Sequence, residues 1–168
     1  MALEVDITKK LDGFFMHMQF QAEREIFAIL GASGCGKSMT LKCIAGIEKP
    51  DEGRIILDGK VLFDSEKKIN LPPQKRKVGY MFQDYALFPH MNVVQNIEAG
   101  MGKRPDRSRT ESLIRQFQLE GLEKKIPGQL SGGQKQRVAI VRSLIMNPDI
   151  MLLDEICSTS RFQRSIPI

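Results

Sequence analysis

The residues from Gly31 to Ser38 have the types and spacing of a phosphate-binding loop. Their sequence is Gly-Ala-Ser-Gly-Cys-Gly-Lys-Ser, which fits the pattern G-x-x-x-x-G-K-[ST]. Glycines in this pattern let backbone N–H groups close around phosphates, and the following helix points its positive end at them. Lys37 is placed to reach the β- and γ-phosphates, and the Ser38 hydroxyl is placed to ligate Mg²⁺. The loop therefore predicts a site for ATP with Mg²⁺.

The predicted nucleotide contacts in this loop are consecutive in the chain. They are Gly31, Ala32, Ser33, Gly34, Cys35, Gly36, Lys37, Ser38 and Met39.

A second motif, Leu130–Gln134, has the sequence Leu-Ser-Gly-Gly-Gln. Ser131 is a candidate N-cap, and Gly132 and Gly133 expose backbone N–H groups to an approaching anion. The segment has no nucleotide loop of its own. It therefore predicts one half of a phosphate site that a single chain cannot complete.

A pair of carboxylates follows an apolar segment near the end of the chain. Ile150–Leu153 is continuously apolar and delivers Asp154 and Glu155 at its carboxyl end. An aspartate in this position organises Mg²⁺, usually through water. Asp154 is therefore a predicted metal-binding residue.

With its motifs in this order, the chain resembles the nucleotide-binding subunits of ABC transporters from about Leu3 to Glu155. The resemblance implies a head-to-tail homodimer with ATP and Mg²⁺ sandwiched between the subunits. It implies that Glu155 acts as the general base that polarises the attacking water. The residues expected to bind the ATP of the other subunit are Ser131, Gly132, Gly133 and Gln134.

Gln83 follows the short apolar segment Val78–Phe82 and matches the glutamine loop of this family. The resemblance implies a catalytic role for Gln83, whose amide senses Mg²⁺ and the attacking water, so Gln83 joins Ser38 and Asp154 as a metal-linked residue. The segment from Gln83 to His90 resembles the surface that these ATPases press against an integral-membrane permease. The expected location is therefore cytoplasmic, peripheral at the inner face of the cell membrane.

A third expectation from the resemblance is an aromatic side chain that stacks on the adenine base, near the first hairpin. The candidates are Leu11, Phe14 and Phe15, and the sequence does not choose among them.

Several elements must position these residues. Asp12-Gly13 and Asp58-Gly59 are two-residue hairpin signals, which predict antiparallel strands on either side of each. Ile26–Leu30 is continuously apolar, as expected for a parallel strand buried on both faces, and it leads directly into the glycine loop. Helical spacing occupies three later ranges, Asn92–Ala99, Ser108–Leu119 and Gly133–Met146.

The predicted fold is α/β: a P-loop NTPase with a RecA-like core sheet, an N-terminal antiparallel β subdomain and an inserted α-helical signature subdomain. We expect one domain over residues 1–168. It comprises the flap and P-loop core (1–82), the glutamine loop and helical subdomain (83–132), the signature helix and second nucleotide-motif strand (133–155), and an atypical tail (156–168). The family continues beyond the second nucleotide motif to a switch histidine, whereas His17 and His90 are the only histidines here. The C-terminal part of the core is therefore expected to be missing.

Composition narrows the class further. A chain of 168 residues with 42% hydrophobic content can bury the core of one domain. The net charge of +5 could suggest nucleic acid. However, the basic segment mixes its bases with prolines and lacks interleaved aromatics, so it predicts a solvated loop and no nucleic-acid partner. Its basic residues are Lys67, Lys68, Lys75, Arg76 and Lys77.

The cysteines and the apolar runs carry less information. Cys35, Cys43 and Cys157 form no C-x-x-C pair, so they indicate neither a disulfide framework nor a zinc site and suit a reducing compartment. No apolar run approaches the roughly 20 residues that a membrane helix needs.

These observations favour an ATP-binding and ATP-hydrolysing subunit of a bacterial ABC importer, most like the molybdate and sulfate branch around residues 57–83. One alternative is a truncated remnant that binds ATP without hydrolysing it, because the switch histidine is absent. The other alternative is an ABC-type ATPase of DNA maintenance. It is disfavoured because the segment between Lys37 and Ser131 has none of the sustained heptads of a long coiled coil.

Overall fold

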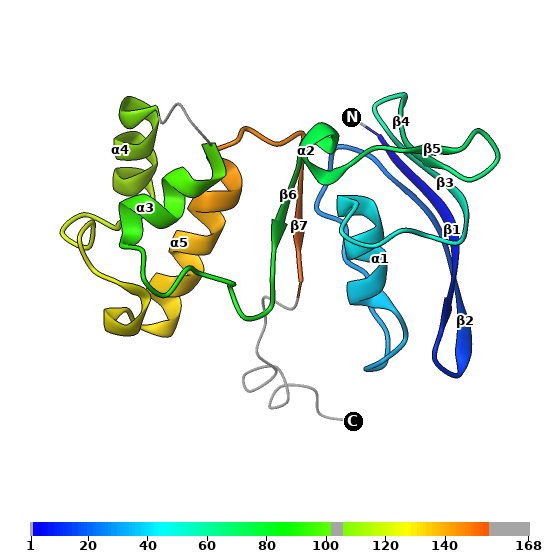
Figure 1. Cartoon of the computed structure of the whole chain (residues 1–168), viewed down its shortest axis with the longest axis horizontal. Coiled ribbons are helices and arrows are strands. Elements are labelled where there is room, and N and C mark those ends of the chain that lie inside the picture. The colour runs from blue at the N-terminus through cyan, green and yellow to red at the C-terminus, as the bar shows by residue number, and fades with distance from the viewer. Residues whose placement is uncertain (1, 102–105, 155–168) are drawn as a thin grey trace. The chain divides into compact units, whose positions relative to one another are not determined.

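The computed structural model of the chain describes residues 2–101 and 106–154 (Figure 1). These residues form two compact units, one ending at Val78 and the other beginning at Gly79. The predicted general base Glu155, the predicted tail 156–168 and Cys157 lie outside the described residues.

The first unit is built on a five-stranded antiparallel sheet in the order β2-β1-β3-β4-β5. Both predicted hairpins are confirmed, because Gly13 and Gly59 take left-handed backbone conformations between paired strands. Side chains of β1 alternate, with Leu3, Val5 and Ile7 buried on one face. The strands are β1 (Leu3–Leu11), β2 (Phe14–Ala22), β3 (Glu52–Leu57), β4 (Lys60–Asp64) and β5 (Ile69–Asn70).

Two helices complete this unit: α1 (Lys37–Ala45) and the single turn α2 (Pro73–Arg76). Arg76 has no exposed surface, although its neighbours Lys75 and Lys77 are exposed. Its guanidinium donates to the carbonyl oxygens of Cys43 and Ile44 at 2.8 and 2.9 Å, at the end of α1. The prediction of a solvated basic loop is therefore wrong for Arg76, because this side chain satisfies carbonyls that the helix end leaves unpaired.

The predicted parallel strand at Ile26–Leu30 is not formed in this structure. The segment has no regular secondary structure, and Ile26 and Leu30 are almost fully exposed. Phe27 alone finds an aromatic partner, since its ring stacks on Phe20 with centroids 4.9 Å apart. A strand requires a neighbour that receives its backbone hydrogen bonds, and none of the described strands pairs with this segment.

The second unit packs helices around one apolar core and adds a two-stranded sheet of β6 (Val78–Met81) and β7 (Ile150–Leu153). The three predicted helical ranges are confirmed to within a few residues at each end. The elements are α3 (Val93–Glu98), η1 (Ala99–Met101), α4 (Arg107–Gln116), η2 (Pro127–Gln129) and α5 (Gly132–Leu144). The core residues are Val93, Ile97, Ile114, Leu119, Leu130, Val138, Val141 and Ile145. Among the described helices, none has both the length and the apolar character needed to cross a bilayer.

Cys43 makes the stability of the first unit sensitive to alkaline pH. The side chain is fully buried on α1, and burial raises the pKa of its thiol to about 11. The nearby charges oppose one another, since Lys9 and Arg76 lower this pKa whereas Glu48 and Asp51 raise it. Burial is therefore the cause of the net shift.

We expect the free energy of unfolding to fall by about 2–3 kcal/mol as pH rises from about 9 to about 11. The thiol ionises near 9 in the unfolded chain but holds its proton in the fold, so alkali favours unfolding. Urea unfolding across this range should show a weaker pH dependence for Cys43→Ala. Some dependence should persist, because burial also raises the pKa of Tyr80. Equal slopes for the two proteins would contradict the assignment to Cys43.

Candidate nucleotide site

The glycine loop is exposed and runs into the N-terminus of α1. Gly34 and Gly36 have φ angles of +83° and +97°, in the region that side chains disfavour. A Cβ on Gly36 would also lie 2.5 Å from the Met16 sulfur. Glycine is therefore required at position 36 both by the backbone and by the packing of β2 against the loop.

Lys37 lies at the end of the glycine loop, and its side chain reaches back to the start of that loop. Its ammonium donates to the carbonyl oxygens of Gly31 and Ala32 at 2.8 and 2.7 Å, and lies 3.8 Å from the sulfur of Cys35. The first turn of α1 contains no acidic residue and no side-chain cap, so its N-terminal end is electropositive. Ser38 and Met39, both half-buried, follow in that turn. The loop and helix start together form a surface that favours an anion.

A cavity of about 480 Å³ adjoins the loop. This volume falls within the usual range of small-ligand sites, roughly 300–1,000 Å³. Of the three candidates for adenine stacking, Phe14 and Phe15 line the cavity, and Leu11 is not among the lining residues. Phe15 is 70% exposed, and the ammonium of Lys10 lies 5.9 Å from its ring centroid. The complete lining is Phe14, Phe15, Met16, His17, Ser33, Gly34 and Cys35.

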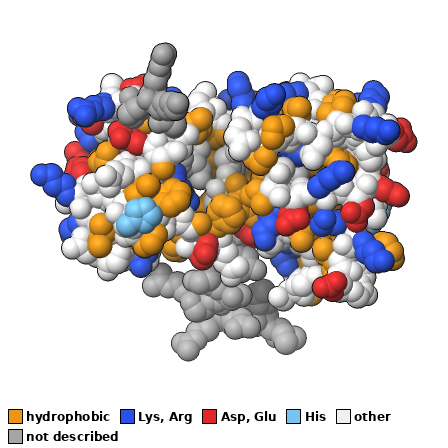
Figure 2. All heavy atoms as spheres, viewed as in Figure 1, with side chains coloured by type: hydrophobic (Ala, Val, Ile, Leu, Met, Phe, Trp, Pro, Cys, Tyr) orange, Lys and Arg blue, Asp and Glu red, His pale blue; other side chains and the backbone are white. Residues whose placement is uncertain are grey.

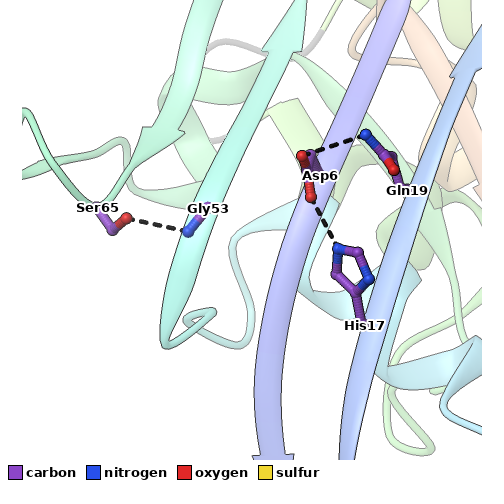
Figure 3. A network of polar contacts seen from close by, with 5 residues as sticks. All are labelled: Asp6, His17, Gln19, Gly53 and Ser65. Atoms are coloured by element: carbon purple, nitrogen blue, oxygen red, sulfur yellow. Dashed lines mark hydrogen bonds and ion pairs between the residues drawn. The ribbon is translucent and has the colours of Figure 1, made fainter.

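His17, on the wall of this cavity, is held by a cross-strand network (Figure 3). Asp6 on β1 accepts from Nε2 of His17 at 3.0 Å and from Nε2 of Gln19 at 3.4 Å. In the same view, Ser65 accepts from the backbone N–H of Gly53 at 3.0 Å. The contact from Asp6 on β1 thus fixes the orientation of the His17 side chain, which lines the cavity.

The second motif forms the start of α5. Ser131 is its N-cap, as predicted: its hydroxyl accepts from the N–H of Gln134 at 3.3 Å, and Oε1 of Gln134 accepts from the N–H of Ser131 at 2.8 Å. This reciprocal pair is a capping box. It fixes both side chains at the helix start and directs the remaining first-turn N–H groups outward.

Gly132 and Gly133 are exposed, and neither has a left-handed backbone. A Cβ at either position would meet no atom within 4 Å apart from its chain neighbours and the backbone of its own helix. The fold of this chain therefore does not require glycine here. Glycine at such positions allows something outside the chain to approach the backbone closely.

Gln83 and Asp154 follow the carboxyl ends of the neighbouring strands β6 and β7. The backbone N–H of Asp154 donates to the carbonyl oxygen of Met81 at 3.1 Å, and Gln83 follows two residues later in an exposed turn. The hydroxyl of Tyr80 donates to Oδ2 of the buried Asp154 at 2.8 Å. Burial raises the pKa of Tyr80, and this hydrogen bond and the nearby carboxylate raise it further.

The contact from Tyr80 was not predicted from the sequence. The one feature of the sequence that could have indicated this contact is a tyrosine in a short strand whose other residues are apolar or glycine. The predicted site residues divide between the two units: the loop lies in the first, whereas Gln83, Ser131, Gly132, Gly133, Gln134 and Asp154 lie in the second.

Each of the two predicted Mg²⁺ ligands has the chemistry that this ion prefers. In residues 2–101 and 106–154, no three His, Cys, Asp or Glu side chains gather to hold a metal by themselves. The predicted ligands, Ser38 and Asp154, are oxygen donors. Mg²⁺ ordinarily takes one or two protein ligands and completes its shell with phosphates and water.

Comparison with known proteins connects these features to one family. The sequence profile described as "ABC transporter" matches residues 16–158. The "Molybdenum import ATP-binding protein ModC" of Paramagnetospirillum magneticum is 43% identical over 156 residues, which cover 91% of this chain and 43% of that protein. The ModC protein of Rhodospirillum rubrum is 39% identical over 165 residues, covering 96% and 45%. The chain thus spans less than half the length of these curated relatives.

Solved structures of ATP-binding cassettes are also similar to this chain. The dimeric ATP-binding cassette MJ0796, described as a post-hydrolysis state bound to ADP and Pi, matches 92% of this chain and 73% of its own with a TM-score of 0.71 and 29% identity. The cbiO1 protein of Clostridium perfringens, described as part of the ABC transporter complex cbiONQ, matches 91% and 64% with a TM-score of 0.71 and 31% identity. These likenesses confirm the predicted fold class.

Proposed function

We propose a function from one premise: this chain belongs to the ABC transporter family. In this proposal it binds Mg-ATP as the ATP-binding part of an importer, and hydrolysis of that ATP powers the import of molybdate or a related oxyanion. The ModC relatives, named for molybdenum import, support this cargo class. The chain itself need not touch the cargo.

The proposed roles follow the chemistry of the side chains. The loop N–H groups and Lys37 bind the phosphates, while Ser38 and Asp154 hold Mg²⁺, which supplies charge neutralisation when bound. Gln83 and Glu155 orient the attacking water. Tyr80 holds the carboxylate of Asp154 through its hydroxyl, 2.8 Å away.

The observation that carries the proposal is the pair Gly132 and Gly133. These glycines are exposed, unstrained and free of neighbours within 4 Å, so their own fold does not explain them. They stand at the start of α5, where outward N–H groups attract an anion. A second copy of the chain, bringing ATP on its own glycine loop, would fill this role. We therefore propose a head-to-tail homodimer that encloses two nucleotides.

Replacing Gly133 with alanine should separate dimerisation from folding. We expect unchanged or slightly higher thermal stability. Alanine lowers the conformational entropy of the unfolded chain, which raises the free energy of unfolding by about 0.4–1 kcal/mol. The methyl group would block close approach, so the Mg-ATP-dependent dimer should weaken at least tenfold, about 1.4 kcal/mol. Sedimentation of the full chain with and without Mg-ATP measures this dimer.

Gly128→Ala is the matched control, because its added methyl group also meets nothing within 4 Å and it lies outside the motif. This variant should dimerise like the unmodified chain. If Gly133→Ala binds ATP and dimerises as tightly as Gly128→Ala, then the start of α5 does not contact the ATP on the glycine loop of a second copy, and the proposed dimer is wrong.

For base stacking, we propose Phe15. Phe15→Ala should weaken ATP binding about 5- to 150-fold, since stacking of one base contributes roughly 1–3 kcal/mol. Because this side chain is 70% exposed, the variant should fold normally. Phe15→Tyr keeps the ring and should bind ATP like the unmodified chain. Fluorescence titration with a labelled ATP would measure the affinities, and an unchanged affinity for Phe15→Ala would exclude Phe15.

The proposed membrane partner is a permease that contacts the segment from Gln83 to His90. In that segment Phe88 is 41% exposed, and its ring lies 6.4 Å from that of His90. Such a contact would hold the chain at the cytoplasmic face of the membrane. On the face shown in Figure 2, basic side chains are interspersed with acidic ones rather than gathered into one patch, which supports a protein partner over nucleic acid.

A further inference from the structure

The turn that follows β6 contains two consecutive residues in the left-handed region. Tyr85 and Ala86 have φ angles of +63° and +42°. This conformation is uncommon for residues with a side chain and persists where the surroundings over-determine it. Within the turn, the N–H of Tyr85 donates to the carbonyl oxygen of Phe82 at 3.0 Å, and the N–H of Ala86 donates to Oδ1 of Asp84 at 3.2 Å.

Arg142, near the end of α5, holds this turn from outside. One guanidinium nitrogen donates to the carbonyl oxygen of Ala86 at 2.7 Å, and another donates to that of Tyr85 at 2.8 Å. The same group lies over the ring of Phe88, 5.7 Å from its centroid. Burial lowers the pKa of Arg142, and the charge of Asp84 partly offsets this shift. The planar guanidinium holds its two donors in a fixed geometry, whereas a lysine ammonium is a compact charge on a flexible stem.

A second buried side chain holds the far end of the same segment. Asn96 on α3 has no exposed surface; its Oδ1 accepts from the N–H of Phe88 at 2.8 Å, and its amide donates to the carbonyl oxygens of Phe88 and Met91 at 3.1 and 2.9 Å. Helices α3 and α5 share one apolar core. The segment is therefore attached to both helices through its backbone.

From this arrangement, we propose that Arg142 is a positioning residue that makes the turn Tyr85–Ala86 follow the motion of α5. The helix begins at the half-site Ser131 and carries Arg142 about three turns later, so one rigid rod joins the two. Engagement of ATP at Ser131 then shifts the surface around Phe88. This inference rests on the proposed function and adds the side chain that attaches the docking segment to α5.

Hydrogen exchange of the full chain tests the link in two arms. Without nucleotide, Arg142→Met should speed exchange of the amides at 84–88 at least tenfold, because the strained turn loses its two carbonyl contacts. With Mg²⁺ and the non-hydrolysable analogue AMPPNP, the unmodified chain should show altered exchange at 84–88. Arg142→Met should lose that response while it binds the analogue with unchanged affinity.

Arg109→Gln is the control, because Arg109 also donates from its guanidinium to a carbonyl oxygen of α5, that of Leu144 at 3.2 Å, but does not touch the turn. It should behave like the unmodified chain in both arms. Arg142→Lys keeps the charge and replaces Arg142→Met as the test variant if Arg142→Met does not fold. Its exchange rates at 84–88 should lie between those of the unmodified chain and those of Arg142→Met.

Two results would overturn the proposal: unchanged exchange at 84–88 in the Arg142 variants without nucleotide, or an equal response to AMPPNP. Failure of the unmodified chain to bind AMPPNP would instead refute the proposed function, and the nucleotide-free arm would still decide whether Arg142 holds the turn.

Discussion

Replacing Lys37 with alanine is expected to weaken Mg-ATP binding at least 100-fold. The ammonium is the charged group of the glycine loop, and the hydrogen bonds that we propose from it to phosphate oxygens would be charge-assisted. Losing two such bonds costs about 3 kcal/mol or more, which is about 100-fold in affinity. Calorimetric titration of the full chain with Mg-ATP would measure this loss.

The same substitution should change the stability of the chain little. Lys37 bridges the carbonyl oxygens of Gly31 and Ala32, which belong to an exposed loop where water can replace it. Lys42→Ala, in the last turn of the same helix, removes an equal charge away from the loop and should bind ATP almost normally. If the two variants bound ATP equally, Lys37 would have no special role.

Replacing Arg76 with methionine is expected to lower the free energy of unfolding by about 3–5 kcal/mol. Its guanidinium satisfies four oxygen acceptors inside the first unit. They are the carbonyls of Cys43, Ile44 and Leu71 and the side-chain oxygen of Asn70, all between 2.7 and 2.9 Å. A methionine of similar length would leave these acceptors without their donor. Urea unfolding monitored by circular dichroism would measure the loss.

Arg54→Met is the control for Arg76. The exposed Arg54 lies 3.6 Å from the buried Asp64, whose carboxylate also accepts from the backbone N–H of Lys67, so removal of Arg54 should cost less than removal of Arg76. Because Arg76 holds the end of α1, and α1 begins at Lys37, the Arg76 variant should also weaken ATP binding where it remains folded. Equal unfolding curves for the two variants would show that the buried contacts of Arg76 contribute little.

Local signals in the sequence predicted most of the elements. Asp12-Gly13 and Asp58-Gly59 determine their hairpins because two-residue turns need left-handed conformations that such pairs tolerate. Ser131 and Gln134, three residues apart, predict the start of α5 because each side chain satisfies the other's backbone N–H group. Each of these turns and caps depends on residues only a few positions apart, so it can be predicted from the local sequence alone.

Other outcomes depended on distant partners. Ile26–Leu30 has the composition of a buried strand, yet it is exposed because no described strand supplies the matching hydrogen bonds. Arg76 lies in a basic cluster that predicted solvent exposure, yet it is buried because α1 presents unpaired carbonyls to it. Of the three candidates for adenine stacking, Phe14 and Phe15 line the cavity beside the loop and Leu11 does not, because β2 packs beside the loop.

The sequence by itself determined the glycine loop, the capped start of α5 and the carboxylate after β7, because their chemistry depends on residue types at short, regular spacing. Only the tertiary structure decided that Tyr80 holds Asp154, that Arg142 holds the turn after β6 and that Gly132 and Gly133 face open space. The physical reason is that each of these outcomes depends on atoms contributed, or left out, by residues far away in the chain.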